Sequence, residues 1–272
     1  MASESSRVLV LGGTGYIGKH LVKASISLGH PTHIYSTQLT PHYSSDSKKE
    51  LLQEFQSLGV TIVYGTLEEQ EKLVGVLRQV DVVICTFAYP QVFEQFKIID
   101  AIKLAGNIKG AYFINLLLRP HENPDTLVVY GTGDVKAVLT YEEDLAAYTI
   151  KAANDPRTCN RVVNSRPQGN IISLHELISL WEKKTGRSFN EVYVTEEELV
   201  KQAETLPNPD NIGVSILHTV FVKGEAVIDF EAGETEILEA SQLYPDYKYT
   251  TIDELLEIML VNPPKPALTA MA

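Results

Sequence analysis

Cysteine is scarce in this sequence, which has two in 272 residues, Cys85 and Cys159. Two thiols are too few for a disulfide scaffold or a thiolate zinc cage. No apolar run approaches the roughly 18 residues that a membrane-spanning helix requires. The stretch from Met1 to Ser6 is polar and has no apolar segment that could act as a secretory signal. We therefore expect a soluble protein of the cytoplasm with reduced thiols and no metal site.

Basic residues are also in short supply. Lys and Arg total 23 against 35 Asp and Glu, a formal net charge of −12, and no cluster of basic residues breaks the pattern. Such a chain repels nucleic-acid phosphates and anionic membrane surfaces. We expect a small-molecule partner, with neither nucleic acid nor membrane. The length is sufficient for one dinucleotide-binding domain with a smaller lobe attached.

The first part of the chain alternates short apolar strands with amphipathic helices. Strands are expected at Val8–Leu11, Thr32–Tyr35, Val60–Tyr64 and Val80–Cys85, and helices at Tyr16–Leu28, Lys48–Leu58, Glu69–Gln79 and Gln91–Ala105. This order predicts a parallel sheet that binds ligands at the carboxyl ends of its strands. Beyond Gly110 the pattern is mixed, with a strand expected at Leu127–Tyr130 and amphipathic helices at Tyr141–Ala153 and Leu174–Thr185. The predicted fold is α/β: a Rossmann-type doubly wound sheet in residues 1–110 and a smaller α/β C-terminal substrate lobe in 111–272.

A glycine-rich turn, GGTGYIG, occupies Gly12 to Gly18. Its glycines satisfy both the G-x-x-G-x-x-G and the G-x-G-x-x-G spacing. The turn follows a strand and opens a helix, so it can let a pyrophosphate approach backbone N–H groups and let the helix pack on the strand. The sequence therefore predicts a nicotinamide dinucleotide site at this turn.

The choice between NAD and NADP is made after the second strand, where an acidic residue would bind the ribose 2′-hydroxyl of NAD. Ser36, Thr37 and Gln38 stand there instead. The nearest cations, Lys48 and Lys49, could reach a 2′-phosphate or could simply be solvated. The missing carboxylate favours NADPH.

Several motifs together resemble one family, the plant isoflavone reductase-like enzymes, which are atypical short-chain dehydrogenases of the NmrA type. The matching segments are GGTGYIG at Gly12–Gly18, AIKLAGNIK at Ala101–Lys109, AYFIN at Ala111–Asn115, YGTG at Tyr130–Gly133, WEKK at Trp181–Lys184 and LYP at Leu243–Pro245. The family includes pinoresinol-lariciresinol reductases, phenylcoumaran benzylic ether reductases, and eugenol and isoeugenol synthases. The resemblance is closest to the synthases and covers nearly the whole chain.

This resemblance implies an NADPH-dependent reductase that acts on phenylpropanoid substrates, of the eugenol or isoeugenol synthase kind. It implies cofactor contacts from the glycine turn and from three later places. The positions are Gly12, Thr14, Gly15, Tyr16, Ile17, Gly18, Thr37, Lys48, Thr86, Phe87, Ala88 and Gln91. Tyr112, Phe113 and His218 match positions near the aromatic substrate, although Tyr112 and Phe113 could instead pack the core and His218 could be a satisfied core histidine.

Two departures from the family pattern stand out. Thr37 replaces the arginine that usually binds the 2′-phosphate. The second departure follows Lys109, where the family continues into a strand, a helix with the general-base lysine, and another strand. Here Lys109 to Ala111 join the two sides directly. Roughly fifty residues are absent, more than the ~30 of a complete strand–helix–strand unit, so the fourth strand is expected to have an unpaired edge.

No other residue emerges as the base, and the catalytic residue stays unknown. Lys103 is expected to be structural, and Lys109 lies at the Lys109–Ala111 junction, called the seam below. Tyr148 and Lys151 are expected to be a solvent-facing pair on a helix. Two functions remain open: an active reductase of coniferyl-type esters, or a shortened, catalytically impaired isoform that at most binds dinucleotide.

Overall fold

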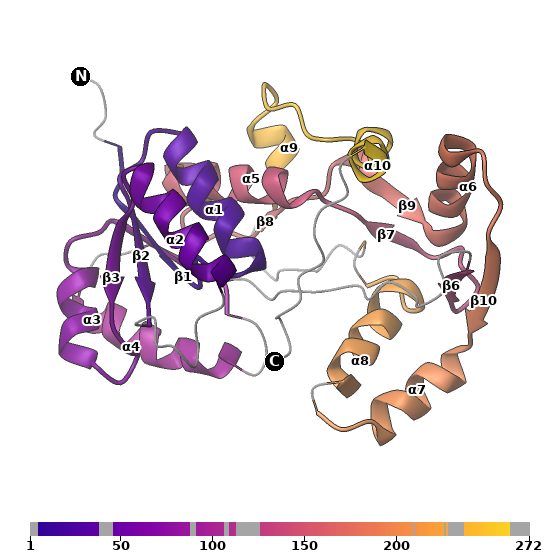
Figure 1. Ribbon diagram of the computed structural model, residues 1–272, viewed down its shortest axis with the longest axis horizontal. Helices are drawn as coiled ribbons and strands as arrows, with labels where there is room; N and C mark the ends of the chain where they lie inside the picture. The colour runs from indigo at the N-terminus through magenta and orange to yellow at the C-terminus, as the bar shows by residue number, and fades with distance from the viewer. Residues whose placement is uncertain are drawn as a thin grey trace. The chain divides into compact units, whose positions relative to one another are not determined.

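The computed structural model describes residues 5–37, 46–87, 91–105, 109–112, 126–208, 210–225, 227 and 237–261 (Figure 1). The chain divides into two compact units. The first takes its described residues from Met1–Asn115 and Leu145–Cys159, and the second from Leu116–Asp144 and Asn160–Leu268.

The first unit is built on a five-stranded parallel sheet with the order β3-β2-β1-β4-β5. Its strands are β1 (Val8–Leu11), β2 (Thr32–Ser36), β3 (Thr61–Tyr64), β4 (Val82–Cys85) and β5 (Lys109–Tyr112). The central strand β1 is buried along its whole length. A continuous apolar run is the pattern expected of a parallel strand that is covered on both faces.

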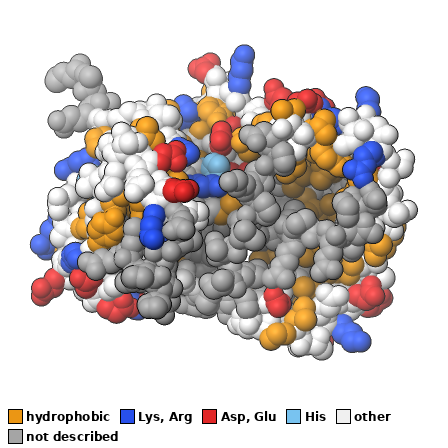
Figure 2. All heavy atoms as spheres, in the orientation of Figure 1, with side chains coloured by type: hydrophobic (Ala, Val, Ile, Leu, Met, Phe, Trp, Pro, Cys, Tyr) orange, Lys and Arg blue, Asp and Glu red, His pale blue; other side chains and the backbone are white. Residues whose placement is uncertain are grey.

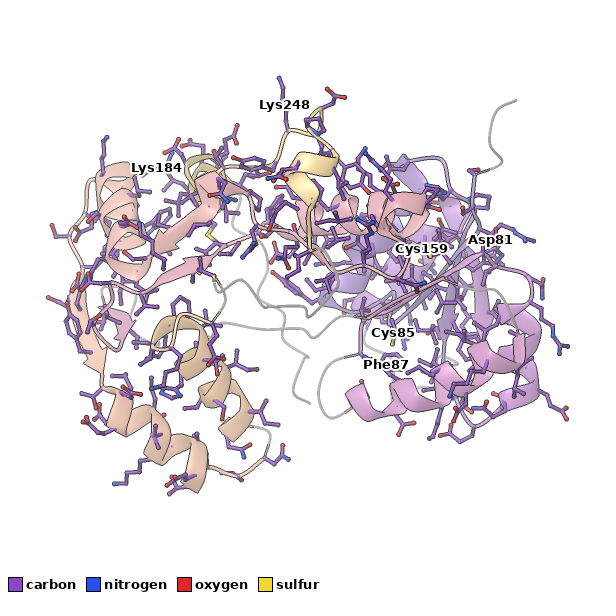
Figure 3. The ribbon with its side chains drawn as sticks, turned by 180° about the vertical axis from the view of Figure 1, so that it is seen from behind. Asp81, Cys85, Phe87, Cys159, Lys184 and Lys248 are labelled. Carbon is purple, nitrogen blue, oxygen red and sulfur yellow. The ribbon has the colours of Figure 1, made fainter. Side chains whose placement is uncertain are left out.

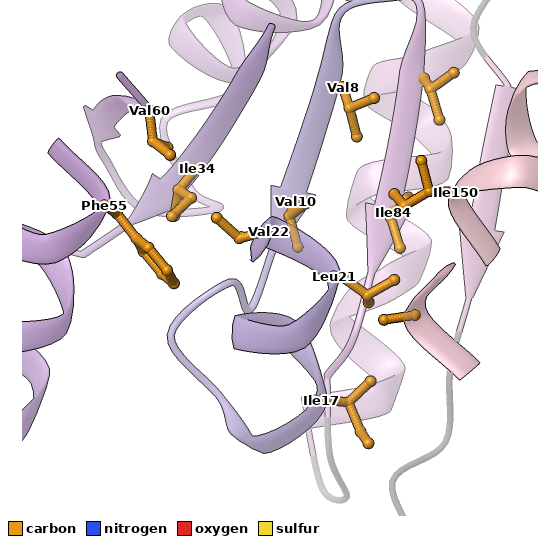
Figure 4. Packing of buried hydrophobic residues seen from close by; sticks show 12 residues of the cluster. Val8, Val10, Ile17, Leu21, Val22, Ile34, Phe55, Val60, Ile84 and Ile150 are labelled. Carbon is orange, nitrogen blue, oxygen red and sulfur yellow. The ribbon is translucent and has the colours of Figure 1, made fainter. Parts of the chain in front are cut away.

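Helices cover both faces of this sheet (Figure 1). They are α1 (Tyr16–Ser27), α2 (Asp46–Ser57), α3 (Gln70–Leu77), α4 (Gln95–Ala105), which follows the short turn η1 (Gln91–Glu94), and α5 (Glu142–Asn154). One core cluster joins Val10, Leu21 and Phe55 (Figure 4). A second cluster joins Leu9, Leu73 and Ile98. Because side chains alternate along β1, Val10 and Leu9 serve opposite faces. The predicted doubly wound parallel sheet is confirmed.

The expectation that the fourth strand has an unpaired edge is wrong. Lys109–Tyr112 forms β5, which pairs with β4 in parallel register, from Val82 opposite Lys109 to Cys85 opposite Tyr112. A four-residue β5 matches the four residues of β4 and satisfies the backbone groups along that edge. The short seam therefore supplies one strand of the sheet.

Helix α5 follows the expected domain boundary at residue 110 in the sequence, yet most of it packs in the first unit. Ala146 and Ile150 are fully buried in the cluster that contains Val10, because an apolar stripe of α5 completes the cover of one sheet face (Figure 4). Tyr148 is 2% exposed, so the prediction of a solvent-facing Tyr148 and Lys151 pair is wrong for the tyrosine. The helix was expected from its periodicity, but periodicity does not say which sheet a helix covers.

In the part of the second unit that the structure describes, the strands form three two-stranded pairings. β6 (Thr126–Tyr130) pairs in parallel with β10 (Asn190–Val194), β7 (Lys136–Val138) pairs antiparallel with β9 (Ile171–Ser173), and β8 (Val163–Asn164) pairs in parallel with β11 (Leu238–Glu239). Its helices are α6 (Leu174–Thr185), α7 (Glu196–Thr205), α8 (Asp210–Phe221), α9 (Ala240–Leu243) and α10 (Ile252–Val261). Short turns lie at η2 (Pro156–Thr158), in the first unit, and η3 (Gln168–Asn170).

Helix α6 has the predicted limits because its ends carry strong local signals. The Ser173 hydroxyl accepts from the Glu176 N–H while the Glu176 carboxylate accepts from the Ser173 N–H, which makes a capping box. At the other end Gly186 adopts a left-handed φ of 68°, the usual stop for a helix.

Both cysteines are free thiols. Cys85 is buried, which raises its pKa to about 11, whereas Cys159 is exposed (Figure 3). Among the helices in the described ranges, none has the length and apolar character needed to cross a bilayer. Acidic and basic side chains are scattered over the face drawn in Figure 2.

A buried carboxylate anchors the segment before α10 in the second unit. Asp144 is 4% exposed and accepts from the Tyr247 hydroxyl at 2.9 Å and from the Thr250 N–H at 2.6 Å. Asn170 in turn donates to the Thr250 carbonyl at 2.9 Å. This network fixes an irregular loop through side chains.

We predict that Asp144→Ala lowers the free energy of unfolding by about 2 kcal/mol, because it removes a buried charged acceptor from two half-buried donors. Denaturant unfolding measures the change. Asp100→Ala is the matched control, since the Asp100 carboxylate forms an exposed pair with Lys103 at 3.3 Å. This variant should leave stability unchanged. Equal effects of the two variants would contradict this role of Asp144.

Candidate dinucleotide-binding site

The glycine-rich turn connects β1 to α1 at the carboxyl end of the central strand. Gly12 has a φ of +80°, a conformation that L side chains rarely adopt. Its carbonyl accepts from the Gly15 N–H at 2.8 Å, which closes the turn. The first predicted glycine is therefore required by backbone geometry.

The start of α1 lies directly against this turn. A β-carbon on Gly18 would overlap the Gly12 carbonyl oxygen and would lie 2.8 Å from the Gly13 α-carbon. Gly18 is thus a position at which the helix backbone lies against the turn with no room for a side chain. Gly15 differs, because its β-carbon would meet only the Gly12 oxygen, at 3.1 Å, and the residue is exposed.

The turn leaves backbone donors available for an anion. Within the described part of the chain, the N–H groups of Gly13 and Thr14 have no hydrogen-bond acceptor. Gly15, the N-cap of α1, has no side chain to cap the helix, and the first turn contains no acidic residue. A helix N-terminus with unfilled donors and a positive dipole end is a binding site for phosphate.

Thr37 and Lys48 lie together at the carboxyl end of β2, the strand that pairs with β1. The Lys48 ammonium donates to the Thr37 hydroxyl at 3.5 Å, although eleven positions separate the two residues. Thr37 follows β2 and is exposed, and Lys48 is in the first turn of α2. A hydroxyl and an ammonium at the end of the second strand form a polar pair that suits a 2′-phosphate.

Tyr16 and Ile17 open α1, and Ile17 is buried in the core cluster with Leu21. Of the residues after β4, Thr86 is 9% exposed and bonded to the turn. Phe87 packs against the cluster that contains Leu9 (Figure 3), and Gln91 is exposed at the start of η1. Ala88 lies outside the described residues.

The predicted substrate residues are only partly described. Tyr112 is the last residue of β5, and its side chain and Phe113 lie outside the described part. His218 on α8 is half-buried, and its Nε2 lies 3.0 Å from a Glu196 carboxylate oxygen. Lys223 donates to the same carboxylate at 2.5 Å.

The Glu196 carboxylate therefore links α7 to His218 on α8 and to Lys223, which follows that helix. Lys223, and after it His218, holds the pKa of the Glu196 carboxyl below its ordinary value. His218 is satisfied by a partner within its own unit. Sequence reasoning missed Glu196, because this residue stands in a run of three glutamates at the start of a helix, where acidic residues are common.

No general base is evident in the described site. Lys103 pairs with Asp100 and is about 71% exposed, and the side chain of Lys109 lies outside the described part. Over those same residues, no three His, Cys, Asp or Glu side chains group as metal ligands would. The site as described can hold a dinucleotide, and the catalytic residue stays unassigned.

The parallel sheet, the glycine turn and the open helix N-terminus define a dinucleotide-binding protein of the Rossmann type. Sequence comparison gives the family. The NmrA-like family matches residues 4–126 and 115–256. Isoeugenol synthase 1 of Petunia hybrida is 46% identical over 321 residues, covering 100% of this chain and 99% of that protein.

Solved structures agree with this result. An isoflavone reductase is 33% identical with a TM-score of 0.81, covering 93% of this chain and 98% of that one. A leucoanthocyanidin reductase of Vitis vinifera, in a binary complex with NADPH, is 28% identical with a TM-score of 0.85, covering 94% and 100%. The chain belongs to the NmrA-like family, and by this membership it is an NADPH-dependent oxidoreductase.

We predict opposite effects for alanine at two helical glycines. Gly18→Ala should lower the free energy of unfolding by about 1–3 kcal/mol, because a β-carbon has no room there. Gly75→Ala in α3 should raise it by about 0.5–1 kcal/mol, because nothing lies within 4 Å of its β-carbon. Thermal or denaturant unfolding of both variants tests this. A stabilising Gly18→Ala would mean that α1 does not rest on the turn.

Proposed function

We propose that this chain is an NADPH-dependent reductase of phenylpropanoid substrates, of the eugenol or isoeugenol synthase type, acting on coniferyl-type esters. The observation that carries the proposal is the glycine turn, whose Gly13 and Thr14 N–H groups are left without acceptors in the described structure. Similarity to isoeugenol synthase 1 over the whole chain supports the substrate class.

The residues of the first unit fit the cofactor. The N–H groups of Gly13, Thr14 and the start of α1 would bind the pyrophosphate. Lys48 and Thr37 would bind the 2′-phosphate, and the segment from Thr86 to Gln91 follows the strand beside the turn. NADPH supplies a hydride from its nicotinamide, and the chain's own residues bind and orient it. Residues 1–110 would form the NADP-binding domain, which the buried face of α5 completes.

Residues 111–272, apart from the residues of β5 and α5 that pack in the first unit, would form the substrate lobe, in which His218 would lie near the aromatic ring of the substrate. Because Glu196 holds the His218 Nε2, only Nδ1 of that imidazole is left to face a ligand. His218 would then act as an oriented polar contact for a phenol or ester oxygen.

A second candidate function rests on the length of the chain. The alignment with isoeugenol synthase 1 spans 321 positions and this chain has 272 residues, so at least 49 aligned positions are gaps in this chain. The two family matches overlap at residues 115–126, close to the seam after Lys109. Both facts favour an internal deletion. Such an isoform would bind dinucleotide and would catalyse poorly, since the family's base lysine has no counterpart.

We predict that NADPH binds more tightly than NADH and that Lys48→Ala narrows the gap, because Lys48 is the charged partner for a 2′-phosphate. Calorimetric titration with both cofactors measures this. Lys72→Ala, which removes the same charge from a surface pair with Glu69, should leave the ratio unchanged. Equal affinities of the parent protein for NADPH and NADH would remove the basis for NADP specificity.

We predict that this chain reduces coniferyl acetate with NADPH far more slowly than a form in which the absent segment is restored. A general base contributes typically ~10² to 10⁴ in rate, so kcat should differ by about that factor. Steady-state assays of the two proteins side by side decide the matter. Comparable kcat values would mean that another residue of this chain is the base.

A further inference from the structure

Thr86 lies immediately after β4 and faces the glycine turn from the neighbouring strand. Its N–H donates to the Leu11 carbonyl at 3.0 Å. Its hydroxyl Oγ1 lies 3.1 Å from the same oxygen and 3.2 Å from the Gly12 carbonyl oxygen. Both carbonyls can only accept, so the hydroxyl proton of Thr86 is shared between them.

The Gly12 carbonyl is the point at which several parts of the turn meet. It accepts from the Gly15 N–H and from Thr86, and the start of α1 rests against it. The next N–H, that of Gly13, belongs to the same planar peptide unit and points the opposite way from the carbonyl. Holding the Gly12 oxygen against Thr86 and the start of α1 therefore turns the Gly13 N–H to the opposite side of this peptide. Among the described residues, this N–H is one of the two turn donors without an acceptor.

A direct contact between Thr86 and the cofactor is the competing role. The side chain has one proton to donate, and that proton is committed to the two carbonyls. The residue is 9% exposed, which leaves little surface for a ligand. The packing around it is also tight, since a β-carbon on Gly12 would lie 2.6 Å from Thr86 Oγ1.

We infer that Thr86 is a positioning residue of the dinucleotide site: its hydroxyl fixes the Gly12–Gly13 peptide so that the Gly13 N–H is presented to the pyrophosphate. The inference rests on the proposed cofactor site for its functional consequence. The claim that Thr86 orders the Gly12 carbonyl concerns the ligand-free protein, so it does not depend on whether the cofactor binds.

The binding test compares three variants by calorimetric titration with NADPH. Thr86→Val keeps the shape and removes the donor, so Kd should rise about three- to ten-fold, the loss expected for one neutral hydrogen bond. Thr86→Ser keeps the donor and should bind within about two-fold of the parent. Serine as weak as valine, or valine as tight as the parent, would overturn the inference.

Thr32→Val is the matched control, because it removes another buried threonine hydroxyl from the same sheet. Thr32 Oγ1 is 2.8 Å from Ser25 Oγ and 2.8 Å from the His30 carbonyl, at the amino end of β2 and away from the turn. This variant should lose thermal stability and keep the parent Kd. If Thr32→Val raised the Kd for NADPH as much as Thr86→Val does, the effect of Thr86 would be one of general stability and the inference would be wrong.

Amide hydrogen exchange of the ligand-free protein supplies a readout that needs no cofactor. The Gly15 N–H is bonded to the Gly12 carbonyl, so its exchange should be several-fold faster in Thr86→Val and unchanged in Thr86→Ser and Thr32→Val. If the parent protein fails to bind NADPH, the proposed function falls and exchange alone decides the inference. Unchanged Gly15 exchange in Thr86→Val contradicts it in either case.

Discussion

The contact between the Gly12 carbonyl and the start of α1 is the constraint on which the rest of the first unit depends. Because Gly18 has no β-carbon, the helix backbone rests on the turn, and the same closeness places Leu21 and Val22 over β1 in the core. It also fixes the helix N-terminus at the carboxyl end of the central strand. One steric requirement therefore sets both the packing and the anion site.

Electrostatics at this site are local. The chain has a net charge of −12, so its long-range field opposes a dinucleotide that carries several negative charges. Attraction must come from groups in contact with the phosphates: backbone N–H groups, the helix dipole and Lys48. An ammonium beside a hydroxyl is a point charge without the planar fork of an arginine. The 2′-phosphate site of this chain is thus expected to be sensitive to salt.

How much the sequence could predict follows from the range of the signals involved. The glycine turn, the limits of α6 and the strands beside β1 depend on residues a few positions apart, and these were predicted. The pairing of β5 with β4 and the position of α5 over the first sheet depend on contacts between segments distant in the chain. Nothing local in Lys109–Tyr112 distinguishes a seam from a strand, and nothing in Ala146 or Ile150 names the sheet they cover.

The candidate site shows the same division. Motif and spacing predict the glycines of the turn and Lys48. By contrast, the hydrogen bond from the Thr86 hydroxyl to the Gly12 carbonyl spans 74 positions of the sequence, and the contact between Glu196 and His218 spans 22. A threonine directly after an apolar strand is too common to single out. The family resemblance marked Thr86 and His218 as positions of interest, and the structure supplies the partners that motif reading lacked.

The most direct test of this account is calorimetric titration of the parent protein and of Gly15→Val with NADPH, together with thermal unfolding of both. Gly15 is exposed, has a φ of −77° that valine can adopt, and its β-carbon would point where the pyrophosphate should lie. The account predicts a folded variant with at most a small drop in melting temperature, because its β-carbon would lie 3.1 Å from the Gly12 oxygen, and no measurable NADPH binding. A folded Gly15→Val that binds NADPH as tightly as the parent would contradict it.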